Sequence, residues 1–251
     1  MLETIDHGKI RELKIARPPA NALNSDLVRK FTASLLEAGE QAEAVVVSGL
    51  PGMFSAGLDV PQLLPLGQEE MTTFWTDFSR LMKTIACMPV PTAFALTGHA
   101  PAGGIVMALF GDYRVMPRGG FKTGLNEVQV GLVVSPPIHG AVVRAVGPRM
   151  AERILVAGLM MESEQAKEIG LIDDLADDPA SAITRAIEWC EQHVALPRDA
   201  MLITRHMARA DLRALFDEEH ELGVGKFVDI WFSDSTRSTL TAMVERLAKK
   251  S

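Results

Sequence analysis

The residues best suited to chemistry lie in one stretch of the chain, residues 97–131. Glu127 is an isolated carboxylate among apolar neighbours, and burial there would raise its pKa toward that of a working base. Gly103 follows a turn of small residues and precedes an apolar segment of helical character. Because glycine has no Cβ, a ligand oxygen can approach its amide closely, and the start of the following helix adds partial positive charge. The stretch therefore predicts a general base and half of an oxyanion site.

A second loop of small residues, 52–59, could supply the other half of that site. It comes directly after residues 44–49, a β-branched run with the pattern of a buried strand. The amide of Ala56 in this loop is therefore expected to reach a ligand oxygen. Together the amides of Ala56 and Gly103 would bind one oxygen while Glu127 transfers a proton. These three residues are the predicted catalytic set.

Four short motifs occur in order along the chain. They read FSAGLDV at residues 54–60, HAPAGG at 99–104, DYR at 112–114 and GLNEVQVGL at 124–132. Together they resemble the crotonase (enoyl-CoA hydratase/isomerase) superfamily, and the resemblance extends over nearly the whole chain. Within it, the chain is most similar to the mitochondrial-type 3,2-trans-enoyl-CoA isomerases, whose catalytic base lies in a GLNE segment of this kind.

The order of elements predicts an α/β fold. Strand, turn, helix and strand follow one another along the chain, which begins with a hairpin over residues 2–15. The resemblance specifies this pattern as the crotonase ββα spiral, with a core over residues 1–195. From residue 180 onward only helices are expected, and the resemblance implies that the C-terminal helical region, 196–251, builds homotrimers or dimers of trimers. The predicted helices of that region span residues 198–208, 211–233 and 235–249.

The number of carboxylates distinguishes between reactions of the resembled family. Hydration of a 2-enoyl thioester needs two acid/base groups, and in the family's hydratases the second glutamate lies three residues after the oxyanion glycine. Val106 occupies that position here. Moving a double bond needs only one carboxylate, which removes a proton from C2 and returns it to C4. The resemblance therefore implies an enoyl-CoA isomerase of fatty acid β-oxidation, which converts 3-enoyl-CoA into 2-trans-enoyl-CoA.

Two alternatives to the isomerase stay open. One is a hydratase or another crotonase reaction, such as thioester hydrolysis, in which Glu127 has a different role. The other is a non-catalytic CoA-binding scaffold, which keeps the fold and the amides but does no chemistry. In each case an acyl-CoA thioester is the expected ligand, and no separate cofactor is expected because CoA is part of the substrate.

By resemblance, the substrate contacts both loops and the residue before the base. The predicted binding residues are Ala56, Gly57, Leu58, Asp59, Val60, Gly103 and Asn126. Candidates for acyl contact are Leu63, Leu64, Leu66, Phe74 and Trp75, and candidates for the CoA phosphates are Arg17, Lys226 and Lys249. A capping or ion-pair role is the alternative for Asp59 and Asp112, for instance with Arg114. Asn126 could equally be a turn residue.

Composition bounds the function further. The chain has 251 residues, of which 47% are hydrophobic and 23% charged, as is ordinary for a globular enzyme. A net charge of −7 argues against a general nucleic-acid surface, because phosphate binding draws on clustered Lys and Arg. No apolar stretch is long enough to span a bilayer, and the N-terminus lacks the pattern of a signal peptide. We therefore expect no membrane partner and a cytoplasmic location.

No metal site is predicted from the cysteines or histidines. Cys87 and Cys190 lie in apolar segments without CxxC spacing, so both are expected to be core thiols in a reducing compartment. The acidic run at residues 217–221 contains one histidine but lacks the HExxH spacing of a zinc helix. A solvated helix face is expected there.

Overall fold

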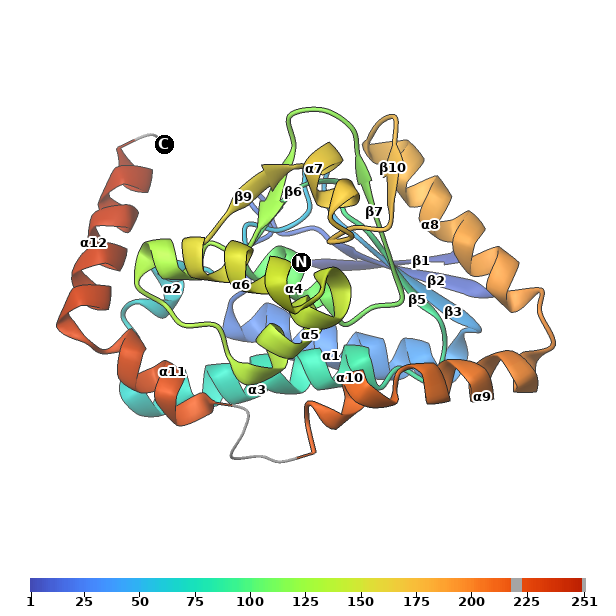
Figure 1. The fold of residues 1–251 in the computed structure, drawn as a ribbon, viewed down its shortest axis with the longest axis horizontal. Helices are drawn as coiled ribbons and strands as arrows, with labels where there is room; N and C mark the ends of the chain where they lie inside the picture. Colours follow the sequence, from blue (N-terminus) through green and yellow to red (C-terminus); the bar gives the residue numbers. More distant parts are fainter. Residues whose placement is uncertain (218–222, 250–251) are drawn as a thin grey trace.

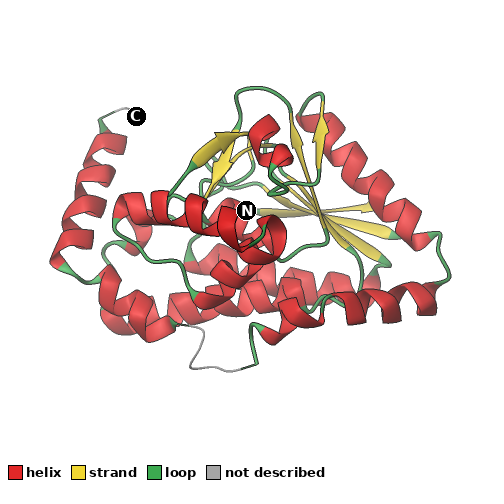
Figure 2. Ribbon diagram, viewed as in Figure 1, coloured by secondary structure: helices red, strands yellow, loops and turns green. Residues whose placement is uncertain are grey.

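Two β-sheets and the helices around them make up this computed structural model, which describes residues 1–217 and 223–249 (Figures 1 and 2). The larger sheet has the strand order β1-β2-β3-β5-β7-β10. Its strands are β1 (Leu2–His7), β2 (Ile10–Ile15), β3 (Ala44–Ser48), β5 (Thr92–Ala95), β7 (Tyr113–Pro117) and β10 (Asp174–Ala176). β1 and β2 pair antiparallel, which confirms the predicted hairpin, and every later neighbouring pair is parallel.

The smaller sheet has the strand order β4-β6-β8-β9. Its strands are β4 (Gly52–Met53), β6 (Gly98–Pro101), β8 (Lys122–Gly124) and β9 (Met160–Glu162). The chain passes from the larger sheet to the smaller one three times in the same way, from β3 to β4, from β5 to β6 and from β7 to β8. Since β4, β6 and β8 are parallel neighbours, the loops that follow them leave the sheet side by side.

Helices cover both faces of the larger sheet, as the alternating side chains of β3 require. Val45 and Val47 pack into a large cluster with α1 (Ser25–Gln41) and α3 (Gln68–Ala86), whereas Val46 packs into a smaller cluster with α8 (Pro179–Val194). The other helices are α2 (Val60–Leu63), α4 (Gly103–Leu109), the 3₁₀ helix η1 (Glu127–Val130), α5 (Pro136–Val146), α6 (Pro148–Ala157), α7 (Ser163–Glu168), α9 (Arg198–Ala208), α10 (Ala210–Ala214), α11 (Val224–Trp231) and α12 (Asp234–Ala248).

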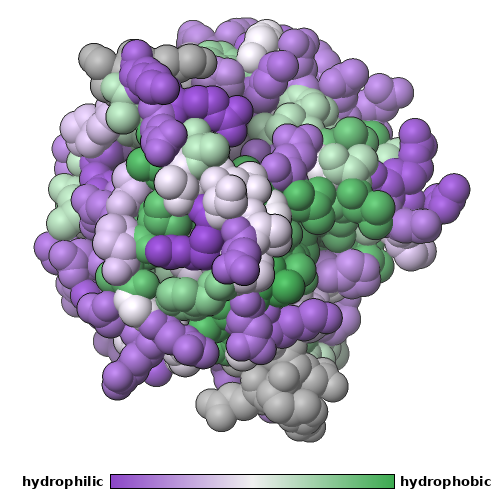
Figure 3. Space-filling view, turned by 90° about the vertical axis from the view of Figure 1, so that its left-hand side faces the viewer, coloured by the Kyte–Doolittle hydropathy of each residue, from purple (hydrophilic) through white to green (hydrophobic). Residues whose placement is uncertain are grey.

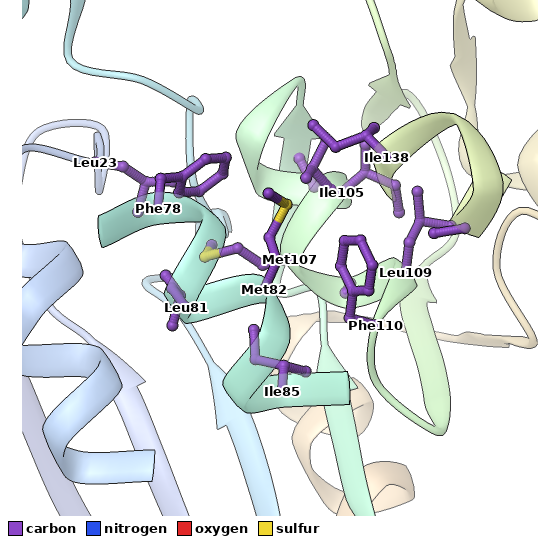
Figure 4. Packing of buried hydrophobic residues seen from close by; sticks show 14 of the residues in the cluster. Leu23, Phe78, Leu81, Met82, Ile85, Ile105, Met107, Leu109, Phe110 and Ile138 are labelled. Atoms are coloured by element: carbon purple, nitrogen blue, oxygen red, sulfur yellow. The ribbon is translucent and has the colours of Figure 1, made fainter. Parts of the chain in front are cut away.

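The core beneath the functional loops is formed by α3, α4 and α5. Figure 4 shows Met82 and Ile85 of α3 beside Met107 of α4, with Ile138 of α5 on the far side. The residues of α4 are buried along its whole length, which explains why its sequence is apolar without helical alternation. This packing fixes the start of α4, where Gly103 lies.

The C-terminal tail differs from the prediction in one place. A continuous helix over residues 211–233 is wrong, because α10 ends at Ala214 and α11 begins only at Val224. Phe216 turns into the core, where its ring lies 5.4 Å from that of Phe110, and Gly223 has a left-handed backbone with φ of +71°. Both features interrupt a helix. Most of the acidic run expected to form a solvated face lies outside the described residues.

The two cysteines have different environments. Cys190 is fully buried between α8 and the sheet, as predicted. The prediction for Cys87 is wrong: this residue is the C-cap of α3 and is exposed, because its neighbours Ala86 and Met88 are the ones that face the core at this end of the helix.

Candidate active site

A cavity of about 110 Å³ lies where the loops after β4 and β6 meet η1 and the C-terminal helices. Its lining is mostly apolar and comes from Ala56, Leu58, Val60, Trp75, Phe78, Ala102, Gly103, Val106, Asn126, Glu127, Val130, Leu132, Val133, Ile138, Phe227 and Met243. Phe227 and Met243 belong to α11 and α12 at one end of the molecule (Figure 1). Figure 3 views the molecule from that end, where apolar side chains lie in a hollow between polar ones.

Glu127 is the one ionisable residue among the described residues that line the cavity. It opens η1, and its Oε2 atom is buried with no hydrogen-bond partner in the described part of the chain. Burial removes the water that would stabilise the charged form, and this raises the pKa of the carboxyl to about 7. The group can therefore both accept and return a proton near neutral pH.

Two backbone amides face this region without an acceptor. Within the described residues, neither the amide of Leu58 nor that of Gly103 donates a hydrogen bond. The two loops that carry them touch, since a Cβ placed on Gly57 would lie 3.0 Å from the nitrogen of Gly103. Two unpaired donors beside an apolar cavity can bind one oxygen that carries developing negative charge.

The prediction for the amide of Ala56 is wrong. Its N–H donates to the carbonyl of Ala20 at 2.9 Å, so it is not available to a ligand. Leu58, two residues further on, forms a parallel β-bridge with Leu23. The hydrogen bonds of this bridge come from the residues on either side of Leu58: the amide of Leu23 donates to the carbonyl of Gly57, and the amide of Asp59 donates to the carbonyl of Leu23. This parallel bridge leaves the Leu58 amide on the opposite side, free. Ala56 still lines the cavity.

Asn21 and Ala102, neither of which is a predicted site residue, help to hold the two loops in place. The buried side chain of Asn21 donates to the carbonyls of Met53 and Phe54 at 3.1 and 3.0 Å, which fixes the loop that leads to Leu58. Ala102 has φ of +46°, an unusual value for a residue with a side chain, and its amide donates to Gly124 at 2.8 Å. Strain of this kind at the turn before α4 is typical of functional sites.

The other predicted binding residues divide into two groups. Val60, Gly103 and Asn126 line the cavity with Leu58. Asp59 does not: its carboxylate caps α2 and lies 2.7 Å from Arg17, so the capping and ion-pair alternative holds. Gly57 is absent from the lining but separates the two free amides. Asp112 also forms ion pairs, although with Arg205 and Arg209 of the tail rather than with Arg114.

The cavity contains one of the five acyl-contact candidates in its lining. Trp75 lines the cavity, whereas Leu63, Leu64, Leu66 and Phe74 do not. The sequence reasoning missed Phe78, Ile138, Phe227 and Met243, which do line it. Phe78 lies in α3, one helical turn from the candidates Phe74 and Trp75, whereas Phe227 and Met243 lie in tail helices outside the four motifs. In the described part of the chain no three His, Cys, Asp or Glu side chains group to hold a metal ion.

Comparison with known proteins identifies the family. The profile of the enoyl-CoA hydratase/isomerase family matches residues 6–250. The chain belongs to this family. It is 28% identical to the mitochondrial enoyl-CoA delta isomerase 1 of Mus musculus, over the whole chain and 88% of that protein. It is also 32% identical to a probable enoyl-CoA hydratase of Mycobacterium tuberculosis, over 75% of this chain and 72% of the relative.

The solved structures of this enoyl-CoA hydratase/isomerase family agree with the fold. The crystal structure of human mitochondrial delta3-delta2-enoyl-CoA isomerase superposes with a TM-score of 0.93 at 25% identity, covering 99% of this chain and 98% of that one. The α/β architecture described above is therefore the crotonase fold, as the four motifs predict. None of the helices in the described residues has the length and apolar character needed to cross a bilayer.

Proposed function

We propose that this enoyl-CoA hydratase/isomerase family member is an isomerase, which converts 3-enoyl-CoA into 2-trans-enoyl-CoA in fatty acid β-oxidation. The thioester oxygen would accept hydrogen bonds from the amides of Leu58 and Gly103. Glu127 would remove a proton from C2 to give a dienolate and then return a proton to C4. The first acyl carbons would lie in the apolar cavity, and the CoA part would extend outside it.

The chemistry of the substrate explains why both parts of the site are needed. A proton beside a thioester is only weakly acidic, so most of the reduction in the barrier must come from stabilising the enolate oxygen. Each preorganised donor of this kind is typically worth about 3 kcal/mol. A base with a pKa near 7 is ionised often enough to take the proton, and its conjugate acid is strong enough to return it.

The single carboxylate in the cavity is the observation that carries this proposal. Val106, at the position of the second glutamate of a hydratase, is buried and lines the same cavity as Glu127. No second acid/base group among the described lining residues is therefore available to hold and activate a water molecule. An apolar wall at this point also keeps water away from the dienolate, which favours return of the proton to carbon.

A hydratase is the second candidate, because the mycobacterial relative is a probable enoyl-CoA hydratase. Supplying 3-hexenoyl-CoA and 2-trans-hexenoyl-CoA separately distinguishes the two. We expect 2-trans-hexenoyl-CoA to form from the first, and the second to gain no water. Rapid hydration of the second compound without migration in the first would support the hydratase instead.

The non-catalytic CoA-binding scaffold is tested with one substitution. Glu127→Gln keeps the shape of the side chain but removes the base, so turnover should fall by a factor of roughly a thousand or more. Binding of an acyl-CoA should persist. A parent protein that binds acyl-CoA but turns over no enoyl-CoA would be a scaffold. The homotrimer or dimer of trimers, the acyl-CoA partner and the cytoplasmic location remain predictions alongside this function.

A further inference from the structure

The first turn of α12 bonds to two segments of the site that are far apart in the sequence. α12 packs against both α2 and η1. α2 follows directly on the loop that carries the Leu58 amide, and η1 begins with Glu127. Neighbouring side chains of α12, Thr236 and Arg237, each donate a hydrogen bond to a backbone carbonyl of one of these segments.

Thr236 holds the end of η1. It is almost completely buried, and its hydroxyl donates to the carbonyl of Gly131 at 2.8 Å. Gly131 closes the turn that begins with Glu127: its amide donates within that turn, and the next amide, that of Leu132, donates to the carbonyl of Glu127 at 2.9 Å. Gly131 has φ of +80°, and a Cβ there would lie 3.0 Å from the Thr236 hydroxyl oxygen. The contact therefore requires both the glycine and the hydroxyl.

Arg237 holds the end of α2. Its Nη1 donates to the carbonyl of Leu64, the C-cap of α2, at 2.6 Å. Its guanidinium also lies 5.5 Å from the centre of the Phe232 ring, which limits where the side chain can go. α2 is a single turn, and its first residue, Val60, lines the cavity. A bond at one end of so short a helix restrains the other end.

We propose that Thr236 and Arg237 are positioning residues, which set the separation between the segment of Glu127 and the segment of the Leu58 amide. Neither touches the cavity, so each acts through the backbone that it holds. This inference rests on the proposed function for its effect on catalysis, but the restraint itself can be measured without a substrate.

The chain offers matched controls on the same helix. Thr239 donates from its hydroxyl to Ser235, and Arg246 donates from Nε to Ala242, so both bond within α12. Replacing Thr239 with Val or Arg246 with Met removes a similar group without releasing either site segment. Thr236→Val and Arg237→Met are the test variants. Thr236→Ser keeps the hydroxyl and should restore the bond.

Hydrogen exchange followed by mass spectrometry measures the restraint directly. In Thr236→Val, amides of the segment around Gly131 and Leu132 should exchange roughly tenfold faster than in the parent protein, because the Gly131 carbonyl loses its donor. In Thr239→Val and Thr236→Ser the rates should stay near the parent values. Unchanged exchange in a folded Thr236→Val variant would overturn the role of Thr236. Arg237→Met tests α2 in the same way if Thr236→Val does not fold.

Kinetics measure what the restraint does. With 3-hexenoyl-CoA, kcat should fall by roughly 10- to 100-fold in Thr236→Val and Arg237→Met while KM changes much less, since displacing a catalytic group mainly slows the chemical step. Parent-like kcat together with fast exchange would overturn the positioning role. An inactive parent protein would contradict the proposed function. The exchange data would then still show whether Thr236 and Arg237 restrain the two segments.

Discussion

Burial of a carboxyl group favours its neutral form, and the Oε2 atom of Glu127 is buried without a hydrogen-bond partner among the described residues. Burial raises its pKa to about 7, and the other described residues lining the cavity do not titrate. In the proposed reaction the base must be ionised to take a proton from C2. We therefore predict that kcat/KM rises about tenfold per pH unit below pH 7 and levels off above it. A rate profile on 3-hexenoyl-CoA between pH 5 and pH 9 measures this, and a profile that is flat across the range contradicts it.

The raised pKa of Glu127 also lowers the stability of the folded protein at high pH. Because its folded pKa lies above its unfolded value of 4.5, the folded protein holds this proton more tightly. The resulting stability is fully present below pH 4.5 and is lost as the pH rises through about 7. Glu127→Gln does not titrate, so we predict that at pH 8 it raises the free energy of unfolding by up to about 3 kcal/mol over the parent protein. Urea unfolding at pH 5 and pH 8 checks this, and the gain should shrink at pH 5.

The choice between Ala56 and Leu58 shows what the motif could not reveal. The sequence indicates that an amide of the loop after β4 faces the ligand, because small residues follow a buried strand. Which amide is free depends on Ala20 and Leu23, and these residues come from a loop about 35 positions earlier. Such pairing between distant segments leaves no local pattern to read.

Gly57 lies between the free amides of Leu58 and Gly103. Alanine there would have φ of +81° and place its Cβ 3.0 Å from the nitrogen of Gly103. We predict that Gly57→Ala lowers kcat/KM by roughly 100-fold, because the donors can no longer converge on one oxygen. Gly52→Ala is the control: its φ of +85° carries similar backbone strain, but nothing lies within 4 Å of the added Cβ. Equal losses in the two variants would assign the effect to strain alone.

At the scale of elements, α11 closes the cavity against α3 through one aromatic pair. The rings of Phe227 and Trp75 are stacked with centroids 3.4 Å apart, and both residues line the cavity. A cavity of about 110 Å³ is smaller than an engineered cavity of about 150 Å³ that holds one benzene molecule. It therefore suits a short acyl segment, and the aromatic pair forms its wall.

Removing that wall should change the preferred substrate. We predict that Phe227→Ala destabilises the fold by about 3–5 kcal/mol and raises the kcat/KM ratio of 3-dodecenoyl-CoA to 3-hexenoyl-CoA. Phe31→Ala serves as the control, since Phe31 is equally buried in α1 but does not line the cavity. It should cost similar stability and leave the ratio unchanged. A ratio that moves equally in both variants would mean that destabilisation, not the wall, sets the preference.

Most elements followed from periodicity, and the failures have physical causes. The strand expected at residues 44–49 and the helices expected at 198–208 and 235–249 lie within one residue of β3, α9 and α12. The sequence signals an interruption near Gly223 and Gly225, but the end of α10 at Ala214 has no such signal, because residues 211–222 contain mostly helix-forming residues. The turn there is set by the burial of Phe216 against Phe110, a contact between segments a hundred residues apart. Tertiary packing overrides local propensity at such points.

At the scale of the whole molecule, one buried charge cluster joins the C-terminal tail to the sheet. Asp112, just before β7, lies 2.7 Å from Arg205 and 2.9 Å from Arg209. Arg209 also donates to the carbonyls of Phe110 and Gly111, and its burial lowers its pKa to about 10. The tail is thus anchored by charges whose desolvation is offset by their ion pairs and by hydrogen bonds to backbone carbonyls.

Breaking this cluster should destabilise the fold strongly. We predict that Asp112→Ala lowers the free energy of unfolding by about 3–5 kcal/mol, because it leaves the buried guanidinium of Arg209 and the partly buried one of Arg205 without a counter-charge. Asp211→Ala, which removes the mostly exposed partner of Arg144, should cost less than about 1 kcal/mol. Urea unfolding of both variants checks the difference. Similar values for the two would show that the cluster does not anchor the tail.

The overall fold, and the presence of Glu127 and Gly103 in one site, were predictable only from the family resemblance. Four motifs indicated the crotonase fold and placed Glu127 and Gly103 in one site, and both line the same cavity. The size of the cavity was not predictable, because its far wall comes from α11 and α12. Those helices carry no motif, and their packing against α3 depends on the complete fold.

The proposed transfer of one proton by Glu127 from C2 to C4 can be tested with a labelled substrate. A single turnover of 2,2-dideuterio-3-hexenoyl-CoA in ordinary water should give 2-trans-hexenoyl-CoA with one deuterium left at C2 and one transferred to C4, and Glu127→Gln should give almost no product. Mass spectrometry of the product locates the label. Product that forms at the parent rate in Glu127→Gln, with only solvent hydrogen added at C4, would contradict the single-base mechanism.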